Sequence, residues 1–120
     1  MHFSLVDSSG RVVVPNLEIA RTLSQQVVGL LKHSSLHHDS GMWLEPCNGV
    51  HTFGMRFCID VVYLDKEGRV LKVKANVAPN RICLPVRTTR AILEIEAGTA
   101  QTKAILVGKR YAIRETQTIP

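Results

Sequence analysis

Cysteine is scarce in this sequence, which has three, Cys47, Cys58 and Cys83, and no Cys-x-x-Cys pair. Three thiols cannot all pair within one chain, and their spacing is unlike that of a structural zinc site. The neighbours of Cys58 are Phe57 and Ile59, and apolar surroundings raise the pKa of a thiol and leave it inert. We therefore expect reduced, packed cysteines of the kind found in cytoplasmic proteins.

Long apolar runs are also missing. No stretch approaches the ~18–20 residues that span a bilayer, and residues 1–7 contain no basic segment followed by an apolar run, so we expect no signal peptide. Apolar residues make up 45% and charged residues 21% of the 120 residues, an ordinary globular composition. We expect a single cytoplasmic domain over residues 1–120, with no association with a membrane.

The sequence lacks the commonest catalytic and cofactor-binding motifs. It contains no glycine loop that cradles phosphate, no Gly-x-Ser-x-Gly turn and no His-Glu-x-x-His helix. We therefore expect no cofactor and no bound metal. His33, His37 and His38 with Asp39 come nearest to a ligand cluster, but His33 and His37 share a helix face only if a helix continues through residues 34–35. A solvated loop is the better interpretation.

Acidic residues are absent from one long segment. Between Arg69 and Leu93 there is no Asp or Glu, whereas the whole chain has 15 Lys and Arg against 10 Asp and Glu, a net charge of +5. The cations of this segment are Arg69, Lys72, Lys74, Arg81, Arg87 and Arg90. The segment has no Phe, Tyr or Trp on which a base could stack, so binding of nucleic acid is disfavoured without being excluded. It predicts a basic face that attracts an anionic small molecule or an acidic protein surface.

Two turns and one capping pattern organise the rest of the chain. Residues 7–12 and 65–70 share the pattern Asp-x-x-Gly-Arg-Val, in which Asp bonds its own backbone and Gly supplies a positive φ. These turns predict one hairpin joining 2–6 to 11–14 and another joining 60–65 to 69–77. Thr22-Leu-Ser-Gln25 fits a capping box before apolar residues at helical spacing, which predicts a helix over about 23–32.

Short strands account for most of the remaining pattern. Residues 59–64 are apolar except for Asp60, as in a strand buried on both faces. Residues 69–77 alternate, with Leu71, Val73, Ala75 and Val77 predicted to point inward and Lys72 and Lys74 outward. Further strands are predicted near 17–19, 41–45, 91–96 (half-exposed) and 109–114, with a short helical turn near 99–104, loop over 78–90 and a frayed tail over 115–120. About eight short strands and one helix predict a mainly β fold of the α+β type, a small antiparallel barrel or rolled sheet.

The stretch His51-Thr-Phe-Gly-Met-Arg-Phe-Cys-Ile-Asp60 is the most specific motif of the chain. Together with Gly41-Met-Trp-Leu, the run Ala91-Ile-Leu-Glu-Ile-Glu-Ala-Gly98 and Val107-Gly108, it resembles the uncharacterised bacterial and archaeal family called domain of unknown function 192. The resemblance covers about residues 10–114. It implies a small β-rich domain with no assigned activity, substrate or cofactor. Where relatives usually have proline before Ile-Asp, this chain has Cys58.

His51, Thr52, Arg56 and Asp60 form a dense polar set next to the apolar centre, and two interpretations remain open. In the first, His51 is an acid/base or ligand-binding group oriented by Asp60 and assisted by Arg56. In the second, Asp60 is a buried carboxylate that pairs with Arg56 or accepts hydrogen bonds from backbone amides and so holds two strands in register. The second is favoured, because buried polar groups usually serve structure.

The sequence therefore favours a binding or interaction module over an enzyme. The expected ligand-binding residues lie on the basic face over 69–90 and beside it: Thr52, Lys72, Lys74, Arg81, Arg87 and Arg90. The alternative is a small acid/base enzyme that acts on an anionic substrate with His51, Arg56 and Asp60. The sequence indicates neither the ligand nor the oligomeric state.

Overall fold

The computed structural model describes residues 2–21 and 37–116, which fold into three β-sheets and one short helix. The strands are β1 (His2–Asp7), β2 (Val12–Val14), β3 (Asn16–Ala20), β4 (Ser40–Leu44), β5 (Val50–His51), β6 (Ile59–Leu64), β7 (Val70–Val77), β8 (Ile82–Cys83), β9 (Ala91–Glu96) and β10 (Tyr111–Thr116). The helix, α2, spans Thr99–Thr102. The predicted mainly β class is confirmed. The helix predicted over 23–32 lies outside the described residues.

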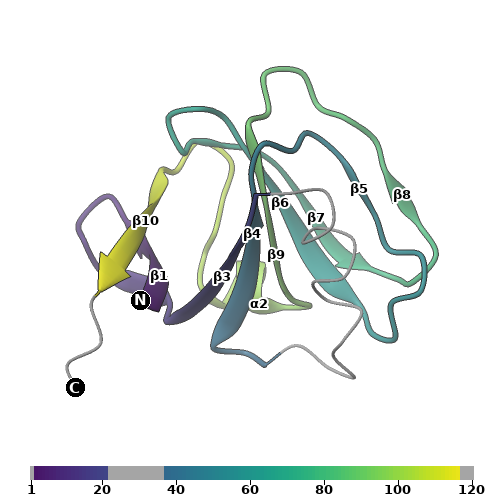
Figure 1. Ribbon diagram of the computed structural model, residues 1–120, viewed down its shortest axis with the longest axis horizontal. Helices are drawn as coiled ribbons and strands as arrows, with labels where there is room; N and C mark the ends of the chain where they lie inside the picture. Colours follow the sequence, from purple (N-terminus) through teal and green to yellow (C-terminus); the bar gives the residue numbers. More distant parts are fainter. Residues whose placement is uncertain (1, 22–36, 117–120) are drawn as a thin grey trace.

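The described strands form separate open sheets rather than a closed barrel. One sheet has the order β3-β4-β9-β6-β7, a second has the order β10-β1-β2, and β5 and β8 form a two-stranded ribbon (Figure 1). Within the described part of the chain every strand pair is antiparallel except β3 and β4, which run parallel. The purely antiparallel expectation is wrong at this pair. Residues 21–39 separate the two strands, and a connection of that length allows a parallel crossover.

Two apolar clusters lie on opposite faces of the five-stranded sheet. Val62 and Leu64 of β6 belong to the first cluster, and Val61 and Tyr63 to the second. The first cluster also contains residues of β1, β2 and β10 and so joins the two larger sheets. The second contains Cys83 of the ribbon. All six residues of β6 are buried, which confirms the strand predicted to be covered on both faces.

Both predicted Asp-x-x-Gly turns are present and have the same construction. In each, the Asp side chain (Asp7 or Asp65) accepts hydrogen bonds from the backbone amides two and four residues later, at 2.9 or 3.0 Å. Gly10 and Gly68 have φ angles of +83° and +80°, in the left-handed region that glycine enters without steric penalty. These turns connect β1 to β2 and β6 to β7, as predicted.

Strand β7 departs from its predicted alternation at shifts of register. One shift lies opposite Asp60, where Asn76 has a φ of 54°. Leu71 packs against the second apolar cluster, Val73 packs against the first, and Ala75 is exposed. The prediction of one inward face for residues 71, 73, 75 and 77 is therefore wrong, because a shift of register changes the side of the sheet to which the following residues point.

The C-terminal part of the described chain completes the three-stranded sheet. Strand β10 pairs with β1 along its whole length, from Tyr111 opposite Asp7 to Thr116 opposite His2. The predicted tail over 115–120 therefore begins two residues too early, and residues 117–120 lie outside the described part. Across residues 2–21 and 37–116, no helix is long and apolar enough to cross a membrane.

The two Asp-x-x-Gly turns provide a matched pair of glycine substitutions. A Cβ at Gly68 would collide with the Tyr111 carbonyl oxygen, whereas a Cβ at Gly10 would meet only the end of the Arg114 side chain, at 3.4 Å. We expect Gly10→Ala to lower the free energy of unfolding by about 1–2 kcal/mol, the cost of a left-handed alanine. Gly68→Ala should lower it by considerably more, because backbone must also move. Urea unfolding measures both, and equal losses would contradict the close approach of Gly68 to β10.

Candidate functional site

The two-stranded ribbon has an inner and an outer face. Strands β5 and β8 are antiparallel, with His51 opposite Ile82. Cys83 is buried in the second apolar cluster, whereas Ile82 is 60% exposed. The Tyr63 hydroxyl, at the end of a fully buried β6 side chain, donates a hydrogen bond to the Leu84 carbonyl at 2.8 Å. This bond ties the ribbon to the five-stranded sheet.

Thr52 closes the end of the ribbon from the inside. Its side chain has no exposed surface. Its hydroxyl donates to the Ala78 carbonyl at 2.7 Å and accepts from the Arg81 amide at 2.8 Å, and the Thr52 amide donates to the Arg81 carbonyl at 2.9 Å. These bonds join two segments that lie far apart in the sequence. Thr52 is therefore a structural connection between the two segments, and its buried side chain is not accessible to a ligand.

Asp60 is fully buried, and both of its carboxylate oxygens accept hydrogen bonds from backbone amides. Oδ1 accepts from Asn76 at 2.8 Å, and Oδ2 accepts from Gly98 and Ala100, each at 3.0 Å. The first donor lies where the register of β7 shifts, and the other two lie at the start of α2, where amides have no partner within the helix. These contacts are those of a structural carboxylate that holds β6, β7 and α2 together.

His51 and Arg56 are exposed, in contrast to Asp60. The His51 ring stacks on Phe53 with a centroid separation of 5.0 Å, and its Nδ1 accepts a hydrogen bond from the Phe53 amide at 3.3 Å. Among the described residues no hydrogen bond or ion pair joins His51, Arg56 and Asp60. A carboxylate that orients an imidazole is therefore not found here, and these contacts give the acid/base hypothesis no support.

The outer face of the ribbon carries exposed apolar side chains. Phe53, Ile82 and Leu84 are 48%, 60% and 66% exposed. Ile82 and Leu84 flank the buried Cys83, so they point away from the sheet, and Phe53 stacks on the cross-strand neighbour of Ile82. Isolated exposed apolar residues are ordinary, whereas a group on one face indicates a contact surface. We call His51, Phe53, Ile82 and Leu84 the ribbon face.

The sequence alone does not predict the ribbon face. Residues 78–90 are predicted as loop, because Pro79 and Pro85 interrupt them and a two-residue strand shows no repeating pattern. The only hint in the sequence is that residues 82–84 are all apolar. This run predicts two exposed apolar side chains only if Cys83, its middle residue, is already known to be buried. That burial depends on β6, about twenty residues earlier in the chain.

The two lysines of β7 point to the side of the sheet that the ribbon covers. Lys72 lies opposite Tyr63, and Lys74 lies opposite Val61. Burial raises the pKa of the Cys83 thiol, and the nearby ammonium groups of Lys74 and Lys72 oppose part of that rise. Both cations therefore lie near strand β8. The structure brings the predicted cations of β7 close to the ribbon.

The predicted arginines differ from one another in their surroundings. Arg81 precedes β8 and is exposed, and Arg87 is exposed on the loop that follows β8. Arg90 donates to a carboxylate oxygen of Glu45 at 3.2 Å, which compensates its charge. In the described part of the chain no ion pair compensates the cations of Lys72, Lys74, Arg81 and Arg87. We call these four residues the basic margin.

Glu94 is a buried carboxylate that the sequence does not single out. It lies on β9 opposite Met42 of β4 and Val61 of β6, and it is 5% exposed. Burial raises its pKa from 4.5 to about 7. The strand predicted as half-exposed is therefore buried, with an acidic side chain on the face of the second apolar cluster. Period-2 alternation predicts that Glu94 faces solvent, and the prediction is wrong because both faces of this sheet are covered.

The cysteines and the histidine loop are the remaining candidates for a catalytic or metal site among the described residues. All three cysteines are free, and burial raises the pKa of the Cys47 and Cys83 thiols, which disfavours their reactive thiolate forms. His37 and His38 stack with their ring centroids 4.5 Å apart, beside Asp39. The ligand atoms of these three residues all lie within 4.8 Å of one another, close enough to hold a metal ion, although the residues are consecutive and largely exposed, and exposed groups of this kind are common without a metal. His33, the fourth residue of the predicted cluster, lies outside the described residues. The interpretation of this segment as a solvated loop stays a prediction.

Comparison with known proteins gives a family match that spans nearly the whole chain. The sequence model of the family DUF192, described as Uncharacterized ACR, matches residues 4–113. No curated protein matches this chain. The match extends over the ribbon, the basic margin and both Asp-x-x-Gly turns.

Three solved structures share the fold. A protein of unknown function from Novosphingobium aromaticivorans DSM 12444 is 27% identical with a TM-score of 0.76, and the alignment covers 92% of this chain and 82% of that one. A protein from Sinorhizobium meliloti 1021, described as a putative transcription regulator, is 22% identical with a TM-score of 0.77, covering 92% and 90%. A putative exported protein from Burkholderia pseudomallei K96243 is 17% identical with a TM-score of 0.53, covering 93% and 24%. The last two similarities concern the fold alone.

We expect Asp60→Asn to lower the free energy of unfolding by roughly 2–5 kcal/mol. In the variant, the side-chain NH₂ group, which is itself a donor, would take the place of one of the two carboxylate oxygens that accept hydrogen bonds from backbone amides. At least one buried backbone amide would then have no acceptor. Asp65→Asn is the control, since the exposed turn of Asp65 uses one oxygen that asparagine retains. Urea unfolding distinguishes the two variants. Losses of equal size would show that the buried amides do not depend on the charge.

The stability of the protein should fall as pH rises, through Glu94. The pKa of this carboxyl group is 4.5 when unfolded and about 7 when folded. Between pH 4.5 and about pH 7, the Glu94 carboxyl group is mostly protonated in the folded chain and mostly ionised in the unfolded chain. The resulting stability is complete below pH 4.5 and is lost as pH rises through 7, a change of about 3 kcal/mol. Glu94→Gln should remove this difference when urea unfolding is followed from pH 4 to 9. Parallel pH curves for the variant and the original chain would contradict the assignment.

Proposed function

The chain belongs to the family DUF192, and we propose that it is a binding module whose ribbon face and basic margin dock an acidic segment of a partner protein. The observation that supports this proposal is the presence of exposed apolar side chains and uncompensated cations on and beside one ribbon. Ile82 and Leu84 are more than half exposed. Covering such side chains releases roughly 1.5–3 kcal/mol each, which gives a docked segment an apolar anchor.

The ribbon is held before any partner arrives. The Tyr63 hydroxyl holds the Leu84 carbonyl, and the Thr52 hydroxyl holds the backbone at Ala78 and Arg81. A surface whose backbone is already fixed loses less conformational freedom on binding, so more of the contact energy contributes to affinity. The buried hydrogen bonds of Thr52 thus fix the backbone that carries the exposed side chains of Ile82 and Leu84.

The charges of this region favour an acidic occupant. No acidic residue lies between Arg69 and Leu93 in the sequence. Cations at the border of an apolar surface attract an oppositely charged partner and fix its orientation. An acidic protein segment with apolar side chains would satisfy both features. Nucleic acid is disfavoured, because the segment that supplies the cations, from Arg69 to Leu93, contains no Phe, Tyr or Trp on which successive bases could stack.

Neutralising the basic margin should weaken the binding of an acidic peptide and leave the fold intact. The variant is Lys72→Gln with Lys74→Gln and Arg81→Gln, and the probe is a fluorescein-labelled peptide of alternating Glu and Leu. We expect fluorescence anisotropy to show roughly tenfold weaker binding, since three partly exposed charge pairs contribute about 0.2–1 kcal/mol each. The original chain should lose affinity as NaCl is raised.

Two further variants make this test specific. Arg11→Gln with Lys66→Gln and Arg114→Gln removes the same charge elsewhere and should leave peptide binding unchanged. Ile82→Ser with Leu84→Ser should weaken binding without altering its dependence on salt. If the two charge variants lose equal affinity, or if duplex DNA or anionic lipid vesicles compete fully with the peptide, docking of an acidic protein segment is wrong. Circular dichroism melting checks that each variant is folded.

A further inference from the structure

A cavity lies away from the ribbon, beside the three-stranded sheet. It has a volume of about 440 Å³ and is formed by the first Asp-x-x-Gly turn, by β2 and by the loop between α2 and β10. In Figure 1 the ribbon lies at the right and β10 and β1 lie at the left, so the two places are at opposite ends of the molecule. No residue of the ribbon face or of the basic margin lines this cavity.

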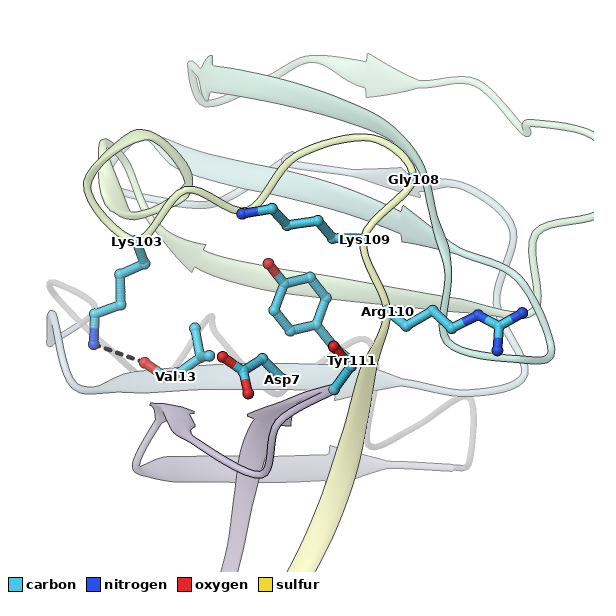
Figure 2. A pocket seen from close by; sticks show the side chains of 8 residues that line it. Asp7, Val13, Lys103, Gly108, Lys109, Arg110 and Tyr111 are labelled. Atoms are coloured by element: carbon cyan, nitrogen blue, oxygen red, sulfur yellow. Dashed lines mark hydrogen bonds between the residues drawn. The ribbon is translucent and has the colours of Figure 1, made fainter.

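Two lysines enter the cavity with their ammonium groups already positioned. Lys103 Nζ donates to the Val13 carbonyl at 2.7 Å (Figure 2). Lys109 Nζ donates to the Ala104 carbonyl at 3.0 Å. An ammonium group has three donors, so each lysine keeps two after this bond. Neither lysine forms an ion pair within residues 2–21 and 37–116. The carbonyl bonds fix the position of each charge and leave it uncompensated.

Tyr111 and Asp7 supply groups of two other kinds. In Figure 2 the Tyr111 ring projects between the two lysines, with the Asp7 carboxylate close to it. Burial raises the pKa of Tyr111, so its hydroxyl keeps its proton. Within the part of the chain that the structure describes, that proton reaches only the Ala104 carbonyl, at a long oxygen–oxygen distance of 3.5 Å, and this carbonyl already accepts from Lys109, so the hydroxyl can turn to donate to a ligand. The hydrogen bonds from the Ser9 hydroxyl and from turn amides all reach Asp7 Oδ1, and they lower the pKa of Asp7. Oδ2 accepts no hydrogen bond from the described residues and is an available acceptor.

Arg110 does not add to the charge of the cavity. Its guanidinium group donates to a carboxylate oxygen of Glu67 at 3.1 Å and points away from the two lysines (Figure 2). The facing groups are therefore two ammonium groups and one phenol as donors, and one carboxylate as acceptor. An anion with oxygen acceptors fits the donors, and a proton on one of its oxygens fits Asp7.

We propose that this cavity binds a phosphate group that carries a protonated oxygen, either inorganic phosphate or a small phosphate monoester. Lys103, Lys109 and the Tyr111 hydroxyl donate to its oxygens, and Asp7 accepts its proton in a hydrogen bond. Sulfate has the same shape and no proton at neutral pH, so the Asp7 carboxylate repels it. The site is thus selective for phosphate over sulfate by one hydrogen bond.

The test is isothermal titration of the full chain with sodium phosphate and with sodium sulfate at pH 6. Phosphate should bind at least roughly tenfold more tightly than sulfate. Protonated phosphate gains a charge-assisted hydrogen bond to the Asp7 carboxylate, whereas sulfate is repelled by it. Lys109→Met should weaken phosphate binding by roughly tenfold, whereas Lys66→Met, an exposed lysine of the other turn, should leave it unchanged. Absence of phosphate binding by the original chain, or equal losses in both lysine variants, would overturn the proposal.

Asp7→Asn tests the selectivity separately. Asparagine keeps the oxygen that holds the turn and removes the negative charge, so sulfate should approach phosphate in affinity while the melting temperature changes little. Unchanged preference for phosphate in this variant would refute the role of Asp7. The Lys72, Lys74 and Arg81 variant should bind phosphate as the original chain does, and loss of binding there would place the phosphate on the ribbon instead.

Discussion

The buried carboxylate of Asp60 is the contact on which the rest of the fold depends. Its three hydrogen bonds to backbone amides join the middle of the five-stranded sheet to β7 and to the start of α2. Two of the three amides belong to backbone that departs from regular structure, since Asn76 has a φ of 54° and Gly98 a φ of 96°, and the third, that of Ala100, lies in the first turn of α2. Charge-assisted bonds of this type are roughly twice as strong as neutral ones. A buried polar group in a strand that otherwise packs apolar side chains thus holds two irregular, exposed segments against the sheet.

The sequence predicts what is local and misses what depends on distant segments. Both Asp-x-x-Gly turns are predictable, because the aspartate bonds amides only two and four residues later. Strand β6 is predictable, because its own six residues show the burial. The β5–β8 ribbon pairs Val50 with Cys83, and no short pattern reports such a pairing. The alternating pattern of β9 would place the Glu94 side chain in solvent if one face of the sheet were open. Both faces are covered by apolar clusters, so Glu94 is buried.

The candidate site shows the same division between local and distant information. The deficit of acidic residues after Arg69 is visible in the sequence, and it identifies the basic margin. Tertiary structure decides which cations remain uncompensated. Arg90 forms an ion pair with Glu45 and Arg110 with Glu67, both of which lie far away in the sequence. The apolar half of the site, Ile82 and Leu84, is defined only by the inward direction of Cys83. Composition therefore indicates the charge of a surface, and packing decides its shape.

Strand β7 lies at one end of the order of the five-stranded sheet. Only its first residue, Val70, exchanges hydrogen bonds with the loop before β10, and no described strand pairs with the outer edge of the rest. A long unpaired edge can recruit a further strand and begin aggregation. Lys72, Lys74 and the irregular backbone at Asn76 interrupt that edge with charge and with a bend. The lysines that border the ribbon thus also oppose the lateral addition of a second chain at this edge of the sheet.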